Sequence, residues 1–131
     1  MAGPIVYIDR SDVTPGTLVD LQTAVSELVA FVEAREPRLI AYGFYIDDVA
    51  STMTVVAVHP DSASLEFHLS IGGPEFRKVG AFIKLRAIEV FGRPSDTALD
   101  QLHEKARMLG DATVLVRSAD AGFARMPSAE T

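Results

Sequence analysis

The chain has 131 residues, 48% of them hydrophobic, and its 18 acidic and 12 basic side chains give a formal net charge of −6. This length favours one domain, which we expect to span residues 1–131, and the negative charge has the wrong sign for binding nucleic-acid phosphates. Because the chain contains no cysteine, disulfides, thiolate metal ligands and cysteine nucleophiles are excluded.

The first residues, Met1-Ala2-Gly3-Pro4, lack the basic segment that opens a targeting signal. No apolar run approaches the roughly 20 residues that are needed to cross a bilayer. We therefore expect a cytoplasmic protein with no membrane partner.

Residues 5–10 are rich in β-branched and aromatic side chains and predict a first strand. A long helix should follow, with Thr14 as its cap and Pro15 at its first position. Pro37 should end this helix near Glu36, because proline disfavours helical geometry in the residue before it. One buried stripe is expected at three- and four-residue steps, made of Leu18, Leu21, Val25, Leu28 and Val32.

Two strands, at about residues 38–46 and 53–59, come next and predict a hairpin. A second helix should open at Pro60-Asp61-Ser62 and end at Gly72-Gly73-Pro74, with further helical turns resuming at about Glu75. A fourth strand is predicted over residues 81–91.

The last third predicts one more helix and strand. Ser95 is a suitable cap, an apolar stripe runs to Leu109, and Gly110 suits the helix end. Residues 113–117 read as a fifth strand. Residues 122–124 could add an edge strand or a crossing arm, and residues 127–131 are expected to fray.

The order β-α-β-β-α-β over about residues 5–91 predicts a ferredoxin-like α+β sandwich, with an αβ extension over about residues 95–126. Within it, the strand at 38–46 has apolar or aromatic side chains on both of its faces. A strand with one solvent-exposed face would instead alternate between apolar and polar residues. Helices of the same chain can cover one face. A second copy would cover the other most simply, so we expect a homodimer.

His68, on the second helix, is the best candidate for a catalytic base, although a structural histidine is the alternative interpretation. Tyr42 and Tyr45 should lie on opposite faces of their strand, so at most one can face a given cavity. Arg86 lies in an apolar strand and needs a partner, for which Asp9 or Glu89 is expected.

The other two histidines predict no metal site. His59 lies nine residues before His68, a spacing that matches no local metal-binding motif. His103 has polar neighbours on its helix, which indicates a solvated position. We therefore expect neither a metal nor a cofactor.

With this segment order, the stretch His59-Pro60-Asp61-Ser62-Ala63-Ser64-Leu65-Glu66-Phe67-His68 makes the chain resemble the antibiotic biosynthesis monooxygenase-like group of dimeric α+β barrel proteins. The resemblance covers about residues 5–91. Ser64, Phe67 and His68 look like the serine, aromatic and histidine positions of that group. It implies two ferredoxin-like units that pack sheet against sheet.

The resemblance also implies an activity. Some members of the group oxidise phenols or hydroquinones with dioxygen and no cofactor, so His68 would be the base and Tyr42 and Arg86 would orient a small aromatic ligand. The chain departs from the haem-degrading and polyketide-oxidising branches, because it has no Trp and no Asn. The alternative is a non-catalytic dimeric ligand-binding or stress-associated barrel.

Overall fold

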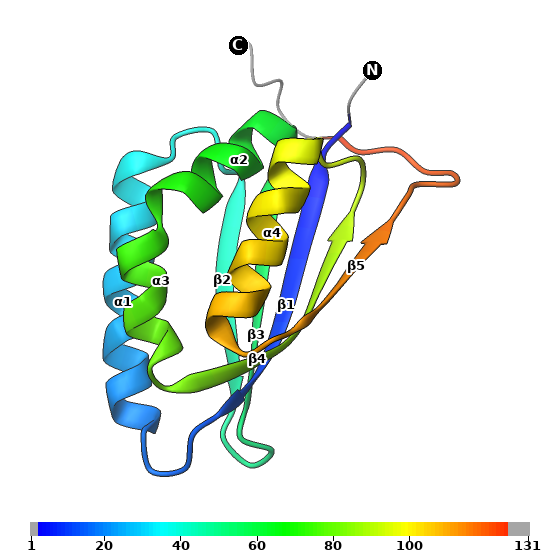
Figure 1. Ribbon diagram of the computed structural model, residues 1–131. Helices are drawn as coiled ribbons and strands as arrows, with labels where there is room; N and C mark the ends of the chain where they lie inside the picture. The colour runs from blue at the N-terminus through cyan, green and yellow to red at the C-terminus, as the bar shows by residue number, and fades with distance from the viewer. Residues whose placement is uncertain (1–2, 126–131) are drawn as a thin grey trace.

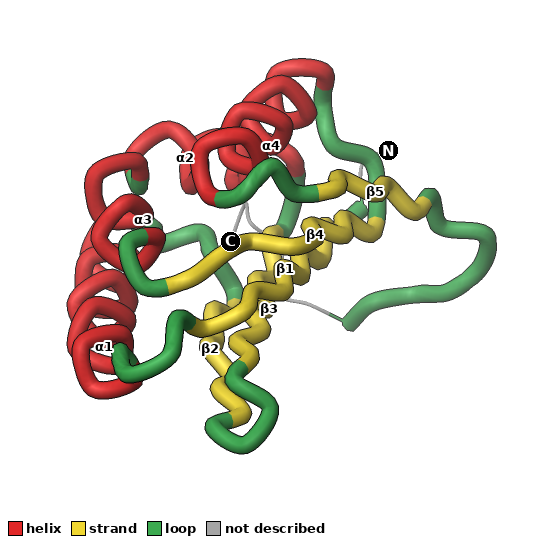
Figure 2. Tube along the Cα trace, turned by 60° about the horizontal axis from the view of Figure 1, so that its bottom comes forward, coloured by secondary structure: helices red, strands yellow, loops and turns green. Residues whose placement is uncertain are grey.

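The computed structural model describes residues 3–125. Within these residues, a five-stranded sheet carries four helices on one of its faces, and Figure 2 shows no helix on the opposite face, which we call the bare face. Along the chain, as labelled in Figure 1, the elements are β1 (Ile5–Val13), α1 (Leu18–Arg35), β2 (Ala41–Asp47), β3 (Thr52–His59), α2 (Ser62–Ile71), α3 (Gly73–Gly80), β4 (Ile83–Phe91), α4 (Asp96–Leu109) and β5 (Thr113–Arg117).

The strand order is β2-β3-β1-β4-β5, with every neighbouring pair antiparallel except the parallel pair of β4 and β5. The first four strands and their helices form the predicted ferredoxin-like sandwich. The helix α4 and the edge strand β5 extend it, as the last third of the sequence predicts. The fold class expected from the segment order is therefore confirmed.

The inner strands alternate between a buried face under the helices and a half-buried face away from them. In β1, for example, Tyr7 and Asp9 are buried and Ile8 between them is not. Edge strand β2 has no fully buried residue in the single chain. Tyr42 packs among the side chains under the helices while Tyr45 is 63% exposed, which confirms that they lie on opposite faces.

The first helix starts later than the sequence predicts. Residues 14–17 form a turn in which Gly16 has a φ of +79° and the Thr17 hydroxyl donates to the Thr14 carbonyl at 2.7 Å, so α1 begins at Leu18. Thr14 is therefore not its cap, because a glycine in the left-handed region interrupts the helical path. The predicted end is confirmed, since α1 stops at Arg35 just before Glu36 and Pro37.

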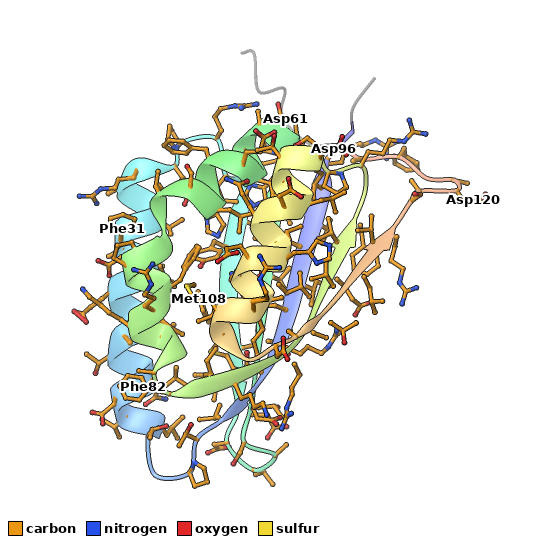
Figure 3. All side chains as sticks on the ribbon, viewed as in Figure 1. Phe31, Asp61, Phe82, Asp96, Met108 and Asp120 are labelled. Carbon is orange, nitrogen blue, oxygen red and sulfur yellow. The ribbon has the colours of Figure 1, made fainter. Side chains whose placement is uncertain are left out.

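Side-chain caps set the starts of α2 and α4. Asp61 accepts a bond from the Ser64 amide at 3.0 Å, and Ser95 accepts one from the Ala98 amide at 3.1 Å. Figure 3 shows Asp61 and Asp96 at the same end of the molecule, and the Ser95 amide donates to the Ser62 hydroxyl at 2.8 Å. The two helix starts are thus tied to each other.

The C-terminal segment differs in part from expectation. Residues 118–125 follow β5 without regular structure, so residues 122–124 form no edge strand. Residues 127–131, where fraying is predicted, lie outside the described residues. Within the described part of the chain, no helix is both long and apolar enough to cross a membrane.

The extension is part of the core. Ala98, Leu102 and Ala106 of α4 pack in one buried cluster with residues of β1, β3 and β4. We expect Leu102→Ala, at a fully buried site, to lower the free energy of unfolding by about 2–5 kcal/mol. Met108→Ala on the same helix is the control, because Met108 is 39% exposed and should cost under about 1 kcal/mol. Urea unfolding measures both, and equal small losses would show that α4 is only loosely attached.

Candidate functional site

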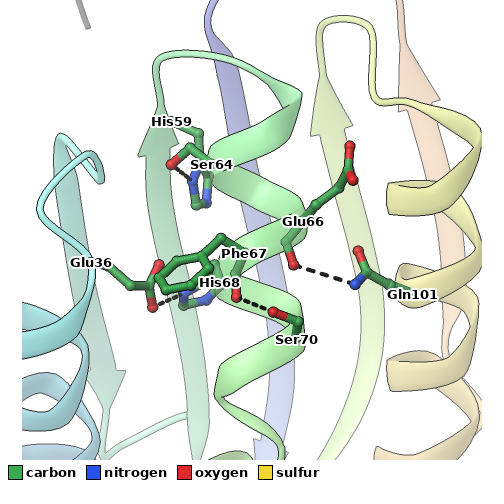
Figure 4. Close-up of polar contacts among 8 residues, drawn as sticks. All are labelled: Glu36, His59, Ser64, Glu66, Phe67, His68, Ser70 and Gln101. Carbon is green, nitrogen blue, oxygen red and sulfur yellow. Dashed lines mark hydrogen bonds and ion pairs between the residues drawn. The ribbon is translucent and has the colours of Figure 1, made fainter.

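His68 lies on the inner face of α2, against the sheet, and is 1% exposed. Its Nδ1 is 2.7 Å from Oε2 of Glu36, the residue that follows α1. Figure 4 shows this contact between the end of one helix and the middle of another. Glu36 itself is 5% exposed, so the pair is buried.

Burial has opposite effects on the two partners. It lowers the pKa of His68 to about 3 and raises the pKa of Glu36 to about 7, because the charged form of each loses hydration. At neutral pH the imidazole is therefore uncharged, and it can donate from Nδ1 to the Glu36 carboxylate once the pH exceeds about 7 and Glu36 is ionised. The other atoms of the pair, Oε1 of Glu36 and Nε2 of His68, have no hydrogen-bond partner among the described residues.

Aromatic rings surround His68. The rings of Tyr42 and Phe76 each lie 5.1 Å from it, centroid to centroid, and the ring of His59 lies at 5.4 Å. The structure thus brings together two of the residues that the sequence singles out, His68 and Tyr42. Burial raises the pKa of the Tyr42 hydroxyl well above its ordinary value, which keeps it protonated at neutral pH.

His59 forms a second buried polar pair. Its Nδ1 is 2.8 Å from the Ser64 hydroxyl oxygen, across the connection between β3 and α2. Burial and the neighbouring His68 lower the pKa of His59 to about 3, so this ring is also uncharged at neutral pH. Its Nε2 has no partner among the described residues.

A third buried group contains a cation from the extension. Lys105 of α4 places its Nζ 3.6 Å from Oδ2 of Asp9, 4.4 Å from the Phe76 ring centroid and 4.9 Å from that of Tyr7. The Tyr7 hydroxyl donates to Asp9 at 2.5 Å. Burial raises the pKa of Asp9 and lowers that of Lys105. Because a buried ion pair contributes little net stability, these residues are candidates for function.

The enclosed space beside these groups is small. A cavity of about 20 Å³ lies between the helices and the sheet, bordered by Asp9, Tyr42, Phe76 and Lys105 among mostly apolar side chains. It has room for about one water molecule.

Two larger spaces open at the surface around Glu36. A hollow of about 480 Å³, which we call the Glu36 hollow, is lined by Arg35, Glu36, Pro37, Arg38, Leu39, Ser64 and Phe67. A second hollow of about 260 Å³ lies on the other side of Glu36, beside Tyr42. The Glu36 hollow has the size of typical small-molecule sites, and its ring of Phe67 is 47% exposed.

Arg86 lies elsewhere. It is exposed on the bare face of the sheet, where its Nε donates to Oδ2 of Asp12 at 2.5 Å. The expected pairing with Asp9 or Glu89 is therefore wrong, because Asp9 faces the helices and Glu89 pairs with Arg10. Within one chain, the sheet separates Arg86 from His68. His103 is exposed, as its polar neighbours predict.

Several site residues escape the reading of the sequence. In the sequence analysis Glu36 only marks the end of a helix, yet it is 5% exposed. Lys105 is not singled out there, yet its side chain is only 10% exposed. One signal in the sequence could have indicated Lys105. Asp9 occupies one of the alternating positions of the first strand that face the core, and a buried carboxylate needs a partner. Residues 3–125 hold no cluster of three or more His, Cys, Asp or Glu side chains that could bind a metal ion.

The buried histidines should make the fold sensitive to acid. Their stabilising contribution is present above their ordinary pKa of 6.5 and is lost as the pH falls toward about 3, because the unfolded chain binds the protons first. Glu36 acts oppositely, since its contribution is lost as the pH rises through about 7. We expect His59→Gln to reduce the loss of unfolding free energy between about pH 6 and about pH 4. The exposed control His103→Gln should lose as much unfolding free energy over this pH range as the wild-type protein, as measured by urea titrations. An equal loss in both variants would contradict the interpretation that His59 is buried and uncharged.

The sequence matches no protein-family model and no curated protein, but the structure resembles solved ones. MupZ from Pseudomonas fluorescens superposes with a TM-score of 0.73 at 16% identity, over 95% of this chain and 91% of that one. A candidate antibiotic biosynthesis monooxygenase from Caulobacter crescentus gives 0.61 at 18% identity, over 72% and 92% of the two chains. SnoaB from Streptomyces nogalater, a cofactor-independent oxygenase, gives 0.60 at 18% identity, over 72% and 96%. The protein therefore has the fold of the antibiotic biosynthesis monooxygenase-like proteins.

Proposed function

We propose that the protein is a cofactor-independent oxygenase that acts on a phenolic or quinol-like compound bound at the Glu36 hollow. The observation that carries the proposal is the buried hydrogen bond between Glu36 and His68 at the edge of a space large enough for one aromatic ring. SnoaB, which shares the fold, supports this class of chemistry.

The chemistry needs a base more than a cofactor. A phenolate is electron-rich enough to reduce dioxygen, so the protein has to remove the phenol proton and hold the anion. Oε1 of Glu36 has no hydrogen-bond partner among the described residues but is itself buried, so the carboxylate has to turn toward the hollow to accept that proton. The pKa of Glu36, about 7, suits transfer near neutral pH. His68 holds the other carboxylate oxygen, so the base proposed at His68 becomes a pair whose outer member is Glu36.

Aromatic side chains complete the proposed site. Phe67 offers an exposed ring in the same hollow as Glu36, and Tyr42 packs against His68 from the sheet. A phenol could therefore stack on Phe67 while its hydroxyl reaches Glu36. Tyr42 does not line the Glu36 hollow, so we propose that it acts by holding His68 in place rather than by contacting the ligand as the family resemblance implies.

The second candidate function is a non-catalytic ligand-binding barrel. It is favoured by the packing around His68, which is 1% exposed and has only the cavity of about 20 Å³ beside Tyr42. In this case the three polar groups fill the interior, and a ligand would bind at the surface without reacting. Oxygen consumption separates the two functions.

We expect Glu36→Gln to lower the rate of oxygen consumption with an accepted quinol at least about 100-fold, because an amide cannot accept the proton. The wild-type rate should rise with pH through about 7 as Glu36 ionises. Glu27→Gln, an exposed change on the same helix, is the matched control and should keep the full rate and the same pH profile. Unchanged turnover in Glu36→Gln would eliminate this base, and no consumption by the wild-type protein with any of a panel of quinols would favour the binding function.

We also propose that the protein is a homodimer joined through the bare faces of two sheets. A group of apolar side chains lies on that face: Ile8 lies opposite Val56, Val6 lies opposite Val58, and Phe91 follows beside Val6. None of these five side chains is fully buried in the single chain. Burying such a surface is the usual driving force for association. The ion pair of Arg86 with Asp12 belongs to the same face.

The dimer can be tested by one charge. We expect Val56→Arg to convert the protein from a dimer to a monomer at micromolar concentration. The arginine would lie in the middle of the proposed interface, where its charge would lose water without gaining a partner. Val49→Arg, in the hairpin where Val49 is 94% exposed, should remain dimeric. Light scattering measures the mass of each, and a monomeric wild-type protein would refute the sheet-to-sheet dimer.

A further inference from the structure

The pair of Ser64 and His59 is not used by the proposed oxygenase chemistry, yet one of its members lines the same hollow. Ser64 borders the Glu36 hollow, whereas His59 lies behind it and is completely buried. The 2.8 Å contact between the Ser64 hydroxyl and Nδ1 of His59 is the distance of a nucleophile from its base.

From this geometry we propose that Ser64 is an acyl-accepting nucleophile and that His59 is its general base, so that the Glu36 hollow also binds and cleaves small esters. The ligand class is an ester with a compact acyl group and an aromatic leaving group. The activity does not depend on dioxygen, and therefore does not rest on the proposed oxygenase function.

The local structure holds Ser64 in place. Its amide donates to Oδ1 of Asp61, and Oδ2 of Asp61 pairs with the guanidinium of Arg38 across the connection from α1 to β2. Ser64 therefore lies in the first turn of α2, where the helix dipole favours negative charge. Arg35 and Arg38 both line the hollow, so the proposed anion at Ser64 would form beside positively charged side chains.

The reaction proceeds in two balanced steps. The Ser64 oxygen bonds to the ester carbon as its proton moves to Nδ1 of His59; the carbon–alkoxy bond then breaks, and the leaving alcohol takes that proton. Water next attacks the acyl-serine, gives its proton to His59, and releases the acid as Ser64 regains its hydrogen. No oxidant, reductant or metal is required.

His59 is suited to begin this sequence because its ring is uncharged. With the ring proton on Nε2, the Nδ1 lone pair faces the Ser64 hydroxyl at 2.8 Å. Burial lowers the pKa of His59 to about 3, which leaves the lone pair unprotonated but weakens it as a base, so its role rests on its position beside the hydroxyl. The carboxylate of Asp61 favours the imidazolium that forms during attack. The unpartnered Nε2 of His59 shows that no carboxylate among the described residues orients the ring, so the pair is a dyad and not a triad.

The test uses 4-nitrophenyl acetate as the probe with the full-length protein. We expect a burst of 4-nitrophenolate and one acetyl group on Ser64, located by mass spectrometry of the peptide from α2. Ser64→Ala should lose the burst and the adduct, and His59→Gln should slow acylation at least about 100-fold. Ser70→Ala is the matched control, because Ser70 lies on the same helix with an exposed side chain that donates only to the Phe67 carbonyl.

The adduct in the wild-type protein decides the matter even if a variant fails to fold. Acetyl groups found only on lysines, or a burst that survives in folded Ser64→Ala, would overturn the proposal. Oxygen consumption by the same samples keeps the two functions apart: an acylating protein that consumes no oxygen refutes only the oxygenase, and the reverse result refutes only the esterase.

Discussion

The structure depends on the right-handed crossover of its parallel strands. Three pairs of successive strands run in the same direction and are linked through helices, although only the last pair are neighbours in the sheet: β1 and β2, β3 and β4, and β4 and β5. A right-handed link between parallel strands places its helix on one defined face of the sheet. The connection from β1 to β2 leads toward one edge of the sheet, whereas those from β3 to β4 and from β4 to β5 lead toward the other edge. Because the strands β3, β4 and β5 also run opposite to β1 and β2, the two reversals cancel, and all the helices lie on the same face. One face is thereby enclosed and the other is left bare.

This one-sided cover explains where polar chemistry can reside. Under the helices, polar side chains lose their water and must find partners, so Glu36 meets His68, Ser64 meets His59, and Asp9 receives both the Tyr7 hydroxyl and the Lys105 cation. Isolated polar groups in such a place would each cost several kcal/mol, on the order of the stability of a small domain. Three atoms of these pairs, Oε1 of Glu36, Nε2 of His59 and Nε2 of His68, have no hydrogen-bond partner among the described residues.

The same cover explains why the hollows lie where they do. α1 ends at Arg35 and the chain needs residues 36–40 to return to the sheet, so the helix layer is interrupted there. Glu36 sits in that interruption, between two surface hollows and in contact with the interior through His68. The site is thus a consequence of a helix end. Proline at position 37 sets that end, because it cannot continue a helix.

The bare face has a different role. Its apolar side chains are contributed by alternate positions of β1, β3 and β4. Its ion pairs are spread along the face, since Arg86 pairs with Asp12 while Glu89, which lies opposite Ile8, pairs with Arg10 and Arg117. A mixture of apolar rows and charge pairs is typical of surfaces that associate specifically. The proposed catalytic site and the proposed dimer face therefore lie on opposite sides of one sheet.

The sequence by itself determined the local structure. The period of apolar residues predicted α1 and α4, Pro37 predicted the helix end, Ser95 the start of α4, and parity placed Tyr42 and Tyr45 on opposite faces, because each of these signals acts within a few residues. The resemblance in residues 59–68 likewise indicated the fold. The start of α1 was missed because the left-handed conformation of Gly16 follows from its neighbours and not from its identity alone.

Only the tertiary structure decided which distant residues meet. Glu36 and His68 are separated by 32 positions, and their contact follows from how α1 and α2 cross the sheet. Arg86 pairs with Asp12 because the register of β1 against β4 shifts between Arg10 and Ser11, so a count of alternating positions assigns it the wrong partner. Lys105 reaches Asp9 because α4 packs over the central strand. Periodicity reports which face a residue occupies, whereas contacts between elements depend on their packing and register, which no local pattern records.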